Sequence, residues 1–171
     1  MVGEKFLIVV VFCLMSFVLP VAAAEEEAGF DRWYVGVAGQ MMLPQGGSRL
    51  HHVGGAALRG GYYLTENWAV EGEVAWLENF AGMGAAALGH FQGWDPYGDL
   101  FGYSRFDPFV TLGVRGWAGH GGGQVGPKAG LGAFYHLTDA WALRADADAT
   151  LGLETNCEML YSLSVGVQYS F

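Results

Sequence analysis

"LRADADATLGL", Leu143 to Leu153, alternates two kinds of residue along its whole length. Arg144, Asp146, Asp148 and Thr150 share one parity, while leucine, alanine and glycine occupy the other. Successive side chains of a β-strand point to opposite sides of the sheet, so the alternation predicts a strand with one polar face. A metal or sugar-nucleotide site at the Asp-Ala-Asp would need further ligands and usually a loop. We therefore interpret both aspartates as part of the polar face of a strand.

The same period of two recurs along the chain, and no segment fits helical spacing better. Eight strands are expected, near residues 33–40, 53–64, 68–78, 84–94, 108–118, 127–137, 141–153 and 159–171. An alternative has the fourth strand running on through Leu100, within the weakly patterned region 95–108. The turns "LTENW", 64–68, and "LTDAW", 137–141, are near-copies, which predicts equivalent positions at one end of the sheet.

Residues 1–24 have the layout of a secretory signal peptide. Lys5 precedes an apolar run from Phe6 to Val18, and small residues end the segment at Ala24. The alternative is a membrane anchor, but the run of thirteen residues is shorter than the roughly 18 that a spanning helix needs. The chain is thus expected to divide into a signal peptide (1–24), a lead-in (25–32) and one patterned domain (33–171).

The composition after residue 24 excludes several classes of function. Glu4 and Lys5 are the only charged residues of the signal peptide, so the rest of the chain has seven Lys and Arg and sixteen Asp and Glu. It has no basic cluster. Nucleic acid is therefore not an expected partner. Cys157 is the single remaining cysteine, so an intrachain disulfide is not possible, and no cofactor or metal site is expected.

The two faces of the strands decide between a soluble barrel and a membrane barrel. A solvated face should be rich in Lys, Glu and Asp. Here the polar face is mainly glycine, serine and alanine, and the apolar face carries aromatic residues near strand ends, as bilayer girdles do. These aromatics are Trp33, Tyr62, Trp68, Trp76, Tyr135, Trp141, Tyr161, Tyr169 and Phe171. Since unpaired strand edges cannot lie in hydrocarbon, we predict an all-β fold, an eight-stranded antiparallel transmembrane up-and-down barrel.

The end of the chain, "YSLSVGVQYSF" (161–171), alternates to its last residue. With the signal peptide and the opening "WYVGVAGQ" (33–40), this sequence resembles the small OmpA-type outer-membrane beta-barrel family. The resemblance implies an outer-membrane location, lipid and lipopolysaccharide as surroundings, and recognition of Tyr169 and Phe171 by the barrel-assembly machinery. Unlike OmpA itself, this sequence shows no peptidoglycan-binding domain after the barrel, so anchoring to the wall is not an expectation of the resemblance.

If the apolar face meets lipid, the polar face lines the lumen. Eight strands leave room for side chains but not for an aqueous channel. Buried charges there must be paired. His90 and His136 are also predicted on the lumen face of their strands. The predicted lumen charge network consists of Arg59, Glu71, Glu73, Arg115, Lys128, Arg144, Asp146 and Asp148.

Two other functions stay open at this point. A lipid-modifying barrel enzyme would use loop residues such as Ser48, His51, His52, His120, Glu154 and Glu158, although none has a diagnostic spacing. A soluble exported barrel would bind a small apolar ligand. We expect no catalytic residues, and a monomeric barrel with a structural or surface-interaction role and at most a very narrow pore.

Overall fold

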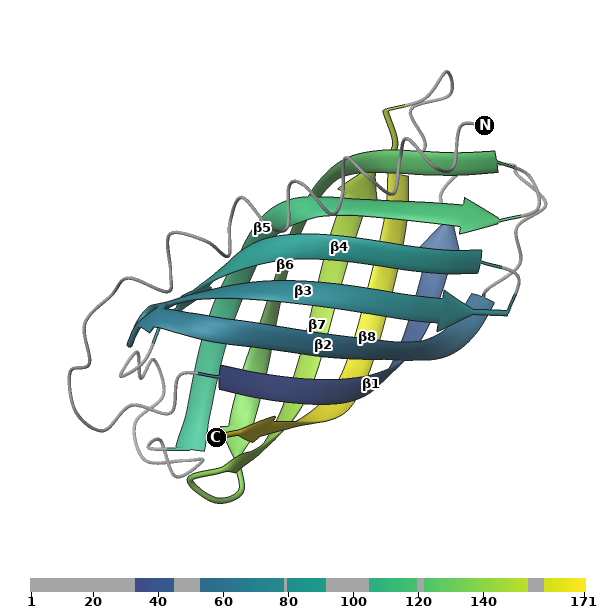
Figure 1. Ribbon diagram of the computed structural model, residues 1–171. Coiled ribbons are helices and arrows are strands. Elements are labelled where there is room, and N and C mark those ends of the chain that lie inside the picture. Colours follow the sequence, from purple (N-terminus) through teal and green to yellow (C-terminus); the bar gives the residue numbers. More distant parts are fainter. Residues whose placement is uncertain (1–32, 45–52, 79, 92–104, 120–121, 154–158) are drawn as a thin grey trace. The chain divides into compact units, whose positions relative to one another are not determined.

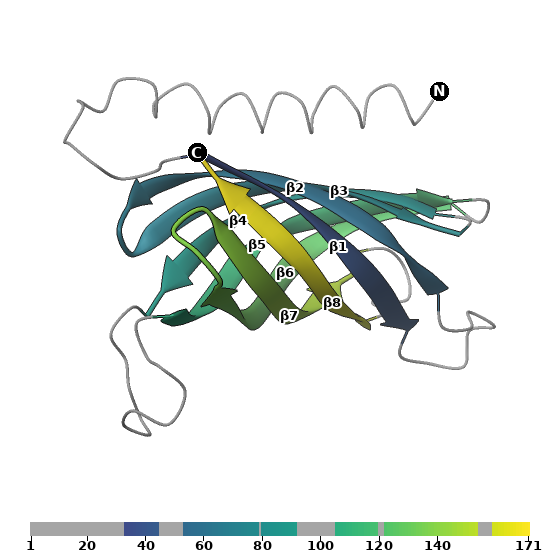
Figure 2. The ribbon, with the colours of Figure 1, turned by 90° about the horizontal axis from the view of Figure 1, so that it is seen from below.

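The computed structural model describes residues 33–44, 53–78, 80–91, 105–119, 122–153 and 159–171, almost all of them in strands. The strands are β1 (Trp33–Pro44), β2 (Val53–Thr65), β3 (Trp68–Leu77), β4 (Phe80–His90), β5 (Phe106–Gly119), β6 (Gly122–His136), β7 (Trp141–Leu151) and β8 (Met159–Ser170). Each pairs antiparallel with its neighbours in the sequence, and β8 pairs with β1 to close a barrel (Figures 1 and 2). The fold is thus the predicted eight-stranded antiparallel barrel. Within the described residues, no helix has the length and apolarity needed to span a membrane.

The stagger of the strands sets the width of this barrel. Starting at Tyr34 and passing from each residue to its registered partner on the next strand, the path returns to β1 at Pro44. The offset is therefore ten residues over eight strands. Such strands are tilted, and they enclose a space that side chains alone can fill.

The barrel has two ends, which we name from the course of the chain. The proximal end is where β1 begins and β8 stops, and the distal end is where β1 meets β2. The two near-copied turns, 64–68 and 137–141, both lie at the proximal end, as predicted. The longest connection, residues 91–105 between β4 and β5, is also proximal.

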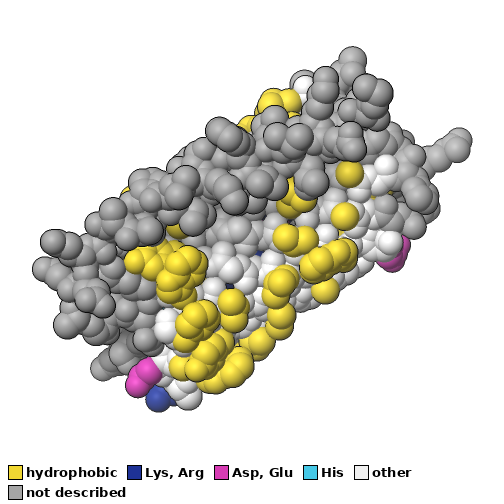
Figure 3. All heavy atoms as spheres, in the orientation of Figure 1, with side chains coloured by type: hydrophobic (Ala, Val, Ile, Leu, Met, Phe, Trp, Pro, Cys, Tyr) yellow, Lys and Arg dark blue, Asp and Glu magenta, His cyan; other side chains and the backbone are white. Residues whose placement is uncertain are grey.

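Large apolar side chains point outward around the barrel. Trp33, Trp68, Trp76, Trp141 and Phe171 are each about half exposed, as are leucines and valines of every strand except β4. Figure 3 shows such hydrophobic side chains spread over one face, with the clearly visible charged side chains toward its two ends. A soluble barrel would reverse this arrangement, because its apolar side chains would fill the interior.

The fourth strand differs from its predicted position. It spans Phe80–His90, whereas the alternation predicts 84–94. The suggested continuation through Leu100 lies outside the described residues. The tight turn after Leu77 returns the chain at once, so β4 begins at Phe80. Its sequence, FAGMGAAALGH, contains mostly glycine and alanine on both faces, so alternation gives little indication of where it starts or ends.

Candidate functional site

The eight side chains predicted for the lumen network all point into the barrel and are buried. None is more than 7% exposed. They form one continuous set of ion pairs that joins β2, β3, β5, β6 and β7. The members are Arg59, Glu71, Glu73, Arg115, Lys128, Arg144, Asp146 and Asp148. Four cations face four carboxylates, so this network carries no net charge.

Glu73 is the carboxylate with the most cationic neighbours in this network. Its Oε2 lies 2.8 Å from Arg59 Nε, and its Oε1 lies 2.6 Å from Arg115 Nη2. Lys128 Nζ is 3.9 Å from Oε2 and 3.2 Å from Asp148 Oδ2. Arg115 also donates to both oxygens of Asp148, at 2.6 and 3.0 Å. Bidentate pairing of this kind fixes both the position and the orientation of a guanidinium.

The alternating stretch 143–153 supplies three members of the network, Arg144, Asp146 and Asp148. Asp146 accepts from Arg59 Nη1 at 2.7 Å and from Arg144 Nε at 2.8 Å. Arg144 reaches across the lumen to Glu71, where both of its terminal nitrogens donate to the carboxylate. Tyr34 donates to the same carboxylate at 2.9 Å.

Hydroxyl groups of β8 complete the arginine shells. Arg59 Nη2 donates to Ser164 Oγ at 2.8 Å, and Arg115 Nη1 donates to Ser162 Oγ at 3.0 Å. Gln40 Nε2 also donates to Ser162, at 3.4 Å. Small polar residues on the inner face of β8 thus act as acceptors for cations that other strands provide.

A proximal aromatic layer closes one end of the network. It consists of Tyr34, Tyr63, Phe109 and Phe134, together with His90, whose ring stacks on Phe134 with centroids 5.7 Å apart. The guanidinium carbon of Arg144 lies 4.9 Å from the ring centroid of Phe109 and 5.2 Å from that of Phe134. Aromatic faces attract cations at these distances.

A distal apolar layer closes the other end. It consists of Met42, Leu77, Trp117 and Leu160, none more than 9% exposed, with Val53 and Phe80 packed against it. The charged residues of the network therefore lie between the proximal aromatic layer and the distal apolar layer.

His90 has a partner that the sequence analysis did not identify. Its Nδ1 lies 2.6 Å from Asp107 Oδ2, and both side chains are buried near the proximal end. Asp107 is at the start of β5, within the region 95–108 that shows little alternation. Asp107 lies at an odd-numbered position, as do Phe109, Thr111 and Arg115, and this shared spacing could have placed it on the inner face. The prediction missed it because β5 begins at Phe106, two residues before the predicted start.

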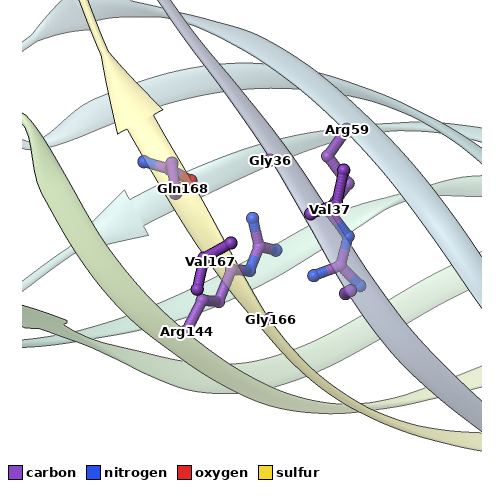
Figure 4. Close-up of a pocket in the computed structure, with 8 residues that line it drawn as sticks. Gly36, Val37, Arg59, Arg144, Gly166, Val167 and Gln168 are labelled. Carbon is purple, nitrogen blue, oxygen red and sulfur yellow. The ribbon is translucent and has the colours of Figure 1, made fainter.

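Gly36 and Gly166 leave a small hollow in the wall between β1 and β8. It measures about 10 Å³, room for about one water molecule, and Arg59, Arg144 and Gln168 line it (Figure 4). The nitrogens of both arginines are already engaged by carboxylates or Ser164. The hollow therefore offers no free cation to an anionic ligand.

The remaining predicted residues fall in different places. Tyr169 and Phe171 lie on the outer face, 37% and 58% exposed, and Tyr169 packs against Trp141. His136 is half-buried beside Phe134 and outside the ion pairs of the network. Among the described residues, no group of three or more His, Cys, Asp or Glu is arranged to hold a metal ion. The alternative enzyme residues lie outside the described residues: Ser48, His51, His52, His120, Glu154 and Glu158.

Comparisons with known proteins agree with this architecture. A family model described as "outer membrane protein beta-barrel domain" matches residues 9–171. A comparison with curated protein sequences finds no match. Among solved structures, Neisserial surface protein A is 16% identical, with a TM-score of 0.64, covering 81% of this chain and 97% of that chain.

Two further structures show the same fold. OprG from Pseudomonas aeruginosa is 12% identical, with a TM-score of 0.60, covering 82% of this chain and 96% of its own. Ail from Yersinia pestis is 14% identical, with a TM-score of 0.51, covering 82% and 97%. At these identities the likeness concerns the barrel alone.

Proposed function

Since this chain belongs to the outer membrane protein beta-barrel family, we propose that it is an integral outer-membrane protein whose barrel is closed to solutes and serves a structural or surface-interaction role. The proximal end, with both strand termini, faces the periplasm, and the distal end faces the cell exterior. The apolar outer face contacts lipid and lipopolysaccharide. The barrel acts as a monomer and has no catalytic activity.

The arrangement of the lumen carries this proposal. Charged residues inside a barrel can line a pore, but here each lies within 4.0 Å of an opposite charge and is no more than 7% exposed. Unpairing one buried charge of such a network costs about 3–5 kcal/mol, so the network resists separation. The aromatic and apolar layers add barriers at both ends.

Conductance measurements test whether the lumen is closed. The refolded protein, added to a planar lipid bilayer, is expected to give no single-channel steps, while an open porin in the same bilayer serves as the positive control. A variant with Trp117→Ala and Phe134→Ala shortens one large side chain in each layer and is expected to stay folded but leak small ions. Regular steps from the unmodified protein would show an open pore and contradict the proposal.

Membrane fractionation tests the location and the assembly signature. The protein is expected in the outer-membrane fraction. On SDS gels, its unheated, folded form is expected to migrate differently from the heated, unfolded form. Replacement of Phe171 by alanine should lower the amount of folded protein there if the assembly machinery reads the last strand. Recovery in the soluble periplasmic fraction would instead favour the soluble barrel. Altered lipid A in cells that carry the protein would favour the enzyme.

A further inference from the structure

The hairpins β2–β3 and β6–β7 are two versions of one sequence. Residues 56–76 and 129–149 align without gaps at an offset of 73, and seven of these 21 positions are identical. The identical positions include Leu64, Thr65 and Trp68, which correspond to Leu137, Thr138 and Trp141. In both turns the threonine Oγ accepts a backbone N–H two residues on, from Asn67 in one and Ala140 in the other.

The strand pairing repeats with the same offset. Tyr62 pairs with Val70 in the first hairpin, and Tyr135 pairs with Leu143 in the second. The preceding strands follow the same rule, because Trp33 pairs with Tyr62 and Phe106 pairs with Tyr135. Three consecutive strands therefore share a register with three others, and the equivalent strands lie four apart, on opposite sides of an eight-stranded barrel.

We infer that the barrel consists of two four-stranded halves that bind one another as partners, β1–β4 and β5–β8, which we call the first half and the second half. The connection 91–105 then joins the two halves at the seam between β4 and β5. The opposite seam lies between β8 and β1, where no connection joins the halves. This division accounts for the longest connection of the barrel, because it links two units and not two strands of one unit.

The interiors of the halves carry side chains of different size at equivalent positions. Gly36 and Gly61 of the first half correspond to Phe109 and Phe134 of the second. A Cβ on Gly61 would meet the ring of Tyr34 at 2.2 Å, and a Cβ on Gly132 would meet Phe109 at 2.5 Å. Within each half, a large side chain thus requires a small residue on the neighbouring strand, as a close-packed interior demands.

The charges of the two halves are complementary. In the lumen network the first half supplies Arg59, Glu71 and Glu73, a net charge of −1, and the second half supplies the other five members, a net charge of +1. Glu71 and Arg144 occupy equivalent positions and pair with one another. Two first halves would bring Glu71 against Glu71, and two second halves would bring Arg144 against Arg144. The partner that each half fits is therefore the other half and not a copy of itself.

The full chain can test this with a protease site inserted into the connection 91–105. The protein is folded, cut, fully denatured and refolded, and the folded band on cold SDS gels is measured. The two pieces are expected to refold with a yield close to that of the uncut chain. A matched chain has its site at Glu66–Asn67, inside the first half, and should refold less well after cutting. Loss of refolding only after cutting at 91–105, or equal yields from the two sites, would overturn the inference.

Charge exchange in the chain cut at 91–105 tests the choice of partner. Arg144→Glu is expected to prevent reassembly, and Glu71→Arg with Arg144→Glu is expected to restore much of it. Arg144→Gln is a milder variant, which keeps the test informative if Arg144→Glu does not fold even uncut, and it should reassemble with reduced yield. The exposed turn substitution Asp139→Lys is the control and should not matter. Reassembly of both Arg144 variants at the unmodified level would overturn the role of charge.

Discussion

The guanidinium carbon of Arg144 lies 5.2 Å from the ring centroid of Phe134, while the nitrogens of the same group donate to Glu71 and Asp146. One side chain thus belongs both to the ion pairs and to the aromatic layer that closes the proximal end. A substitution of Arg144 should therefore weaken both the ion pairs and the packing of the aromatic layer.

Replacement of Arg144 by methionine should strongly destabilise the barrel. The change leaves Glu71 with no cation in contact and removes one of two from Asp146. Breaking a buried pair by removing one partner costs about 3–5 kcal/mol. Urea unfolding in detergent, followed by tryptophan fluorescence, measures the loss. Arg105→Met, at an exposed position, is the control and should change stability by less than about 0.5 kcal/mol. Equal effects of the two variants would contradict this account of the network.

Two glycines of β2 should respond differently to alanine. A Cβ at Gly61 would lie 2.2 Å from the ring of Tyr34, whereas a Cβ at Gly54 would meet nothing within 4 Å. Gly61→Ala must displace Tyr34 from Glu71, and overpacking of this kind costs about 1–3 kcal/mol. Gly54→Ala should be close to neutral. The same unfolding experiment compares them, and a stable Gly61→Ala protein would mean that the proximal layer has room to rearrange.

Two threonines should respond to valine with opposite signs. Thr150 Oγ1 is fully buried and has no hydrogen-bond partner, so Thr150→Val removes an unsatisfied polar atom and should stabilise the barrel by about 1 kcal/mol. Thr138 Oγ1 accepts from the backbone N–H groups of Ala140 and Trp141, so Thr138→Val should destabilise by about the same amount. The shift in the urea midpoint gives both signs. Destabilisation by Thr150→Val would indicate that its hydroxyl is satisfied in solution.

Glu78 adopts a left-handed backbone conformation, with φ of 25°, in the turn between β3 and β4. Non-glycine residues are strained there by about 1–2 kcal/mol, so Glu78→Gly should stabilise the turn by up to that amount. Glu66→Gly is the matched control, because Glu66 sits in a two-residue turn without a positive φ and should gain nothing. Thermal melts monitored on SDS gels would distinguish the two variants. An equal rise for both would refute a local cause.

Alternation in the sequence predicts the side to which a residue points, but not which residue it meets across the barrel. It therefore places Arg144 and Glu71 in the lumen without predicting their pair, which depends on the ten-residue stagger of the closed sheet. It also fails where both faces are small, as in β4. The pairing of His90 with Asp107 combines both difficulties, because β4 starts four residues early and Asp107 lies in a weakly patterned segment.

Alternation also did not predict the proximal aromatic layer or the distal apolar layer. Phe134 shares its parity with Lys128, yet it packs with Phe109 and supports Arg144. A polar face and an aromatic layer can occupy the same side of a strand at different heights. Height along the axis depends on strand tilt, which the closed structure provides and the sequence does not.

The equal numbers of cations and carboxylates in the lumen network have an electrical consequence. Moving one elementary charge across a potential of 100 mV changes the free energy by about 2.3 kcal/mol. Four positive and four negative groups enter the membrane together, so an ion gradient across the membrane neither pulls this network into place nor expels it. We therefore expect growth media of very different salt content to leave the stability of the inserted barrel unchanged.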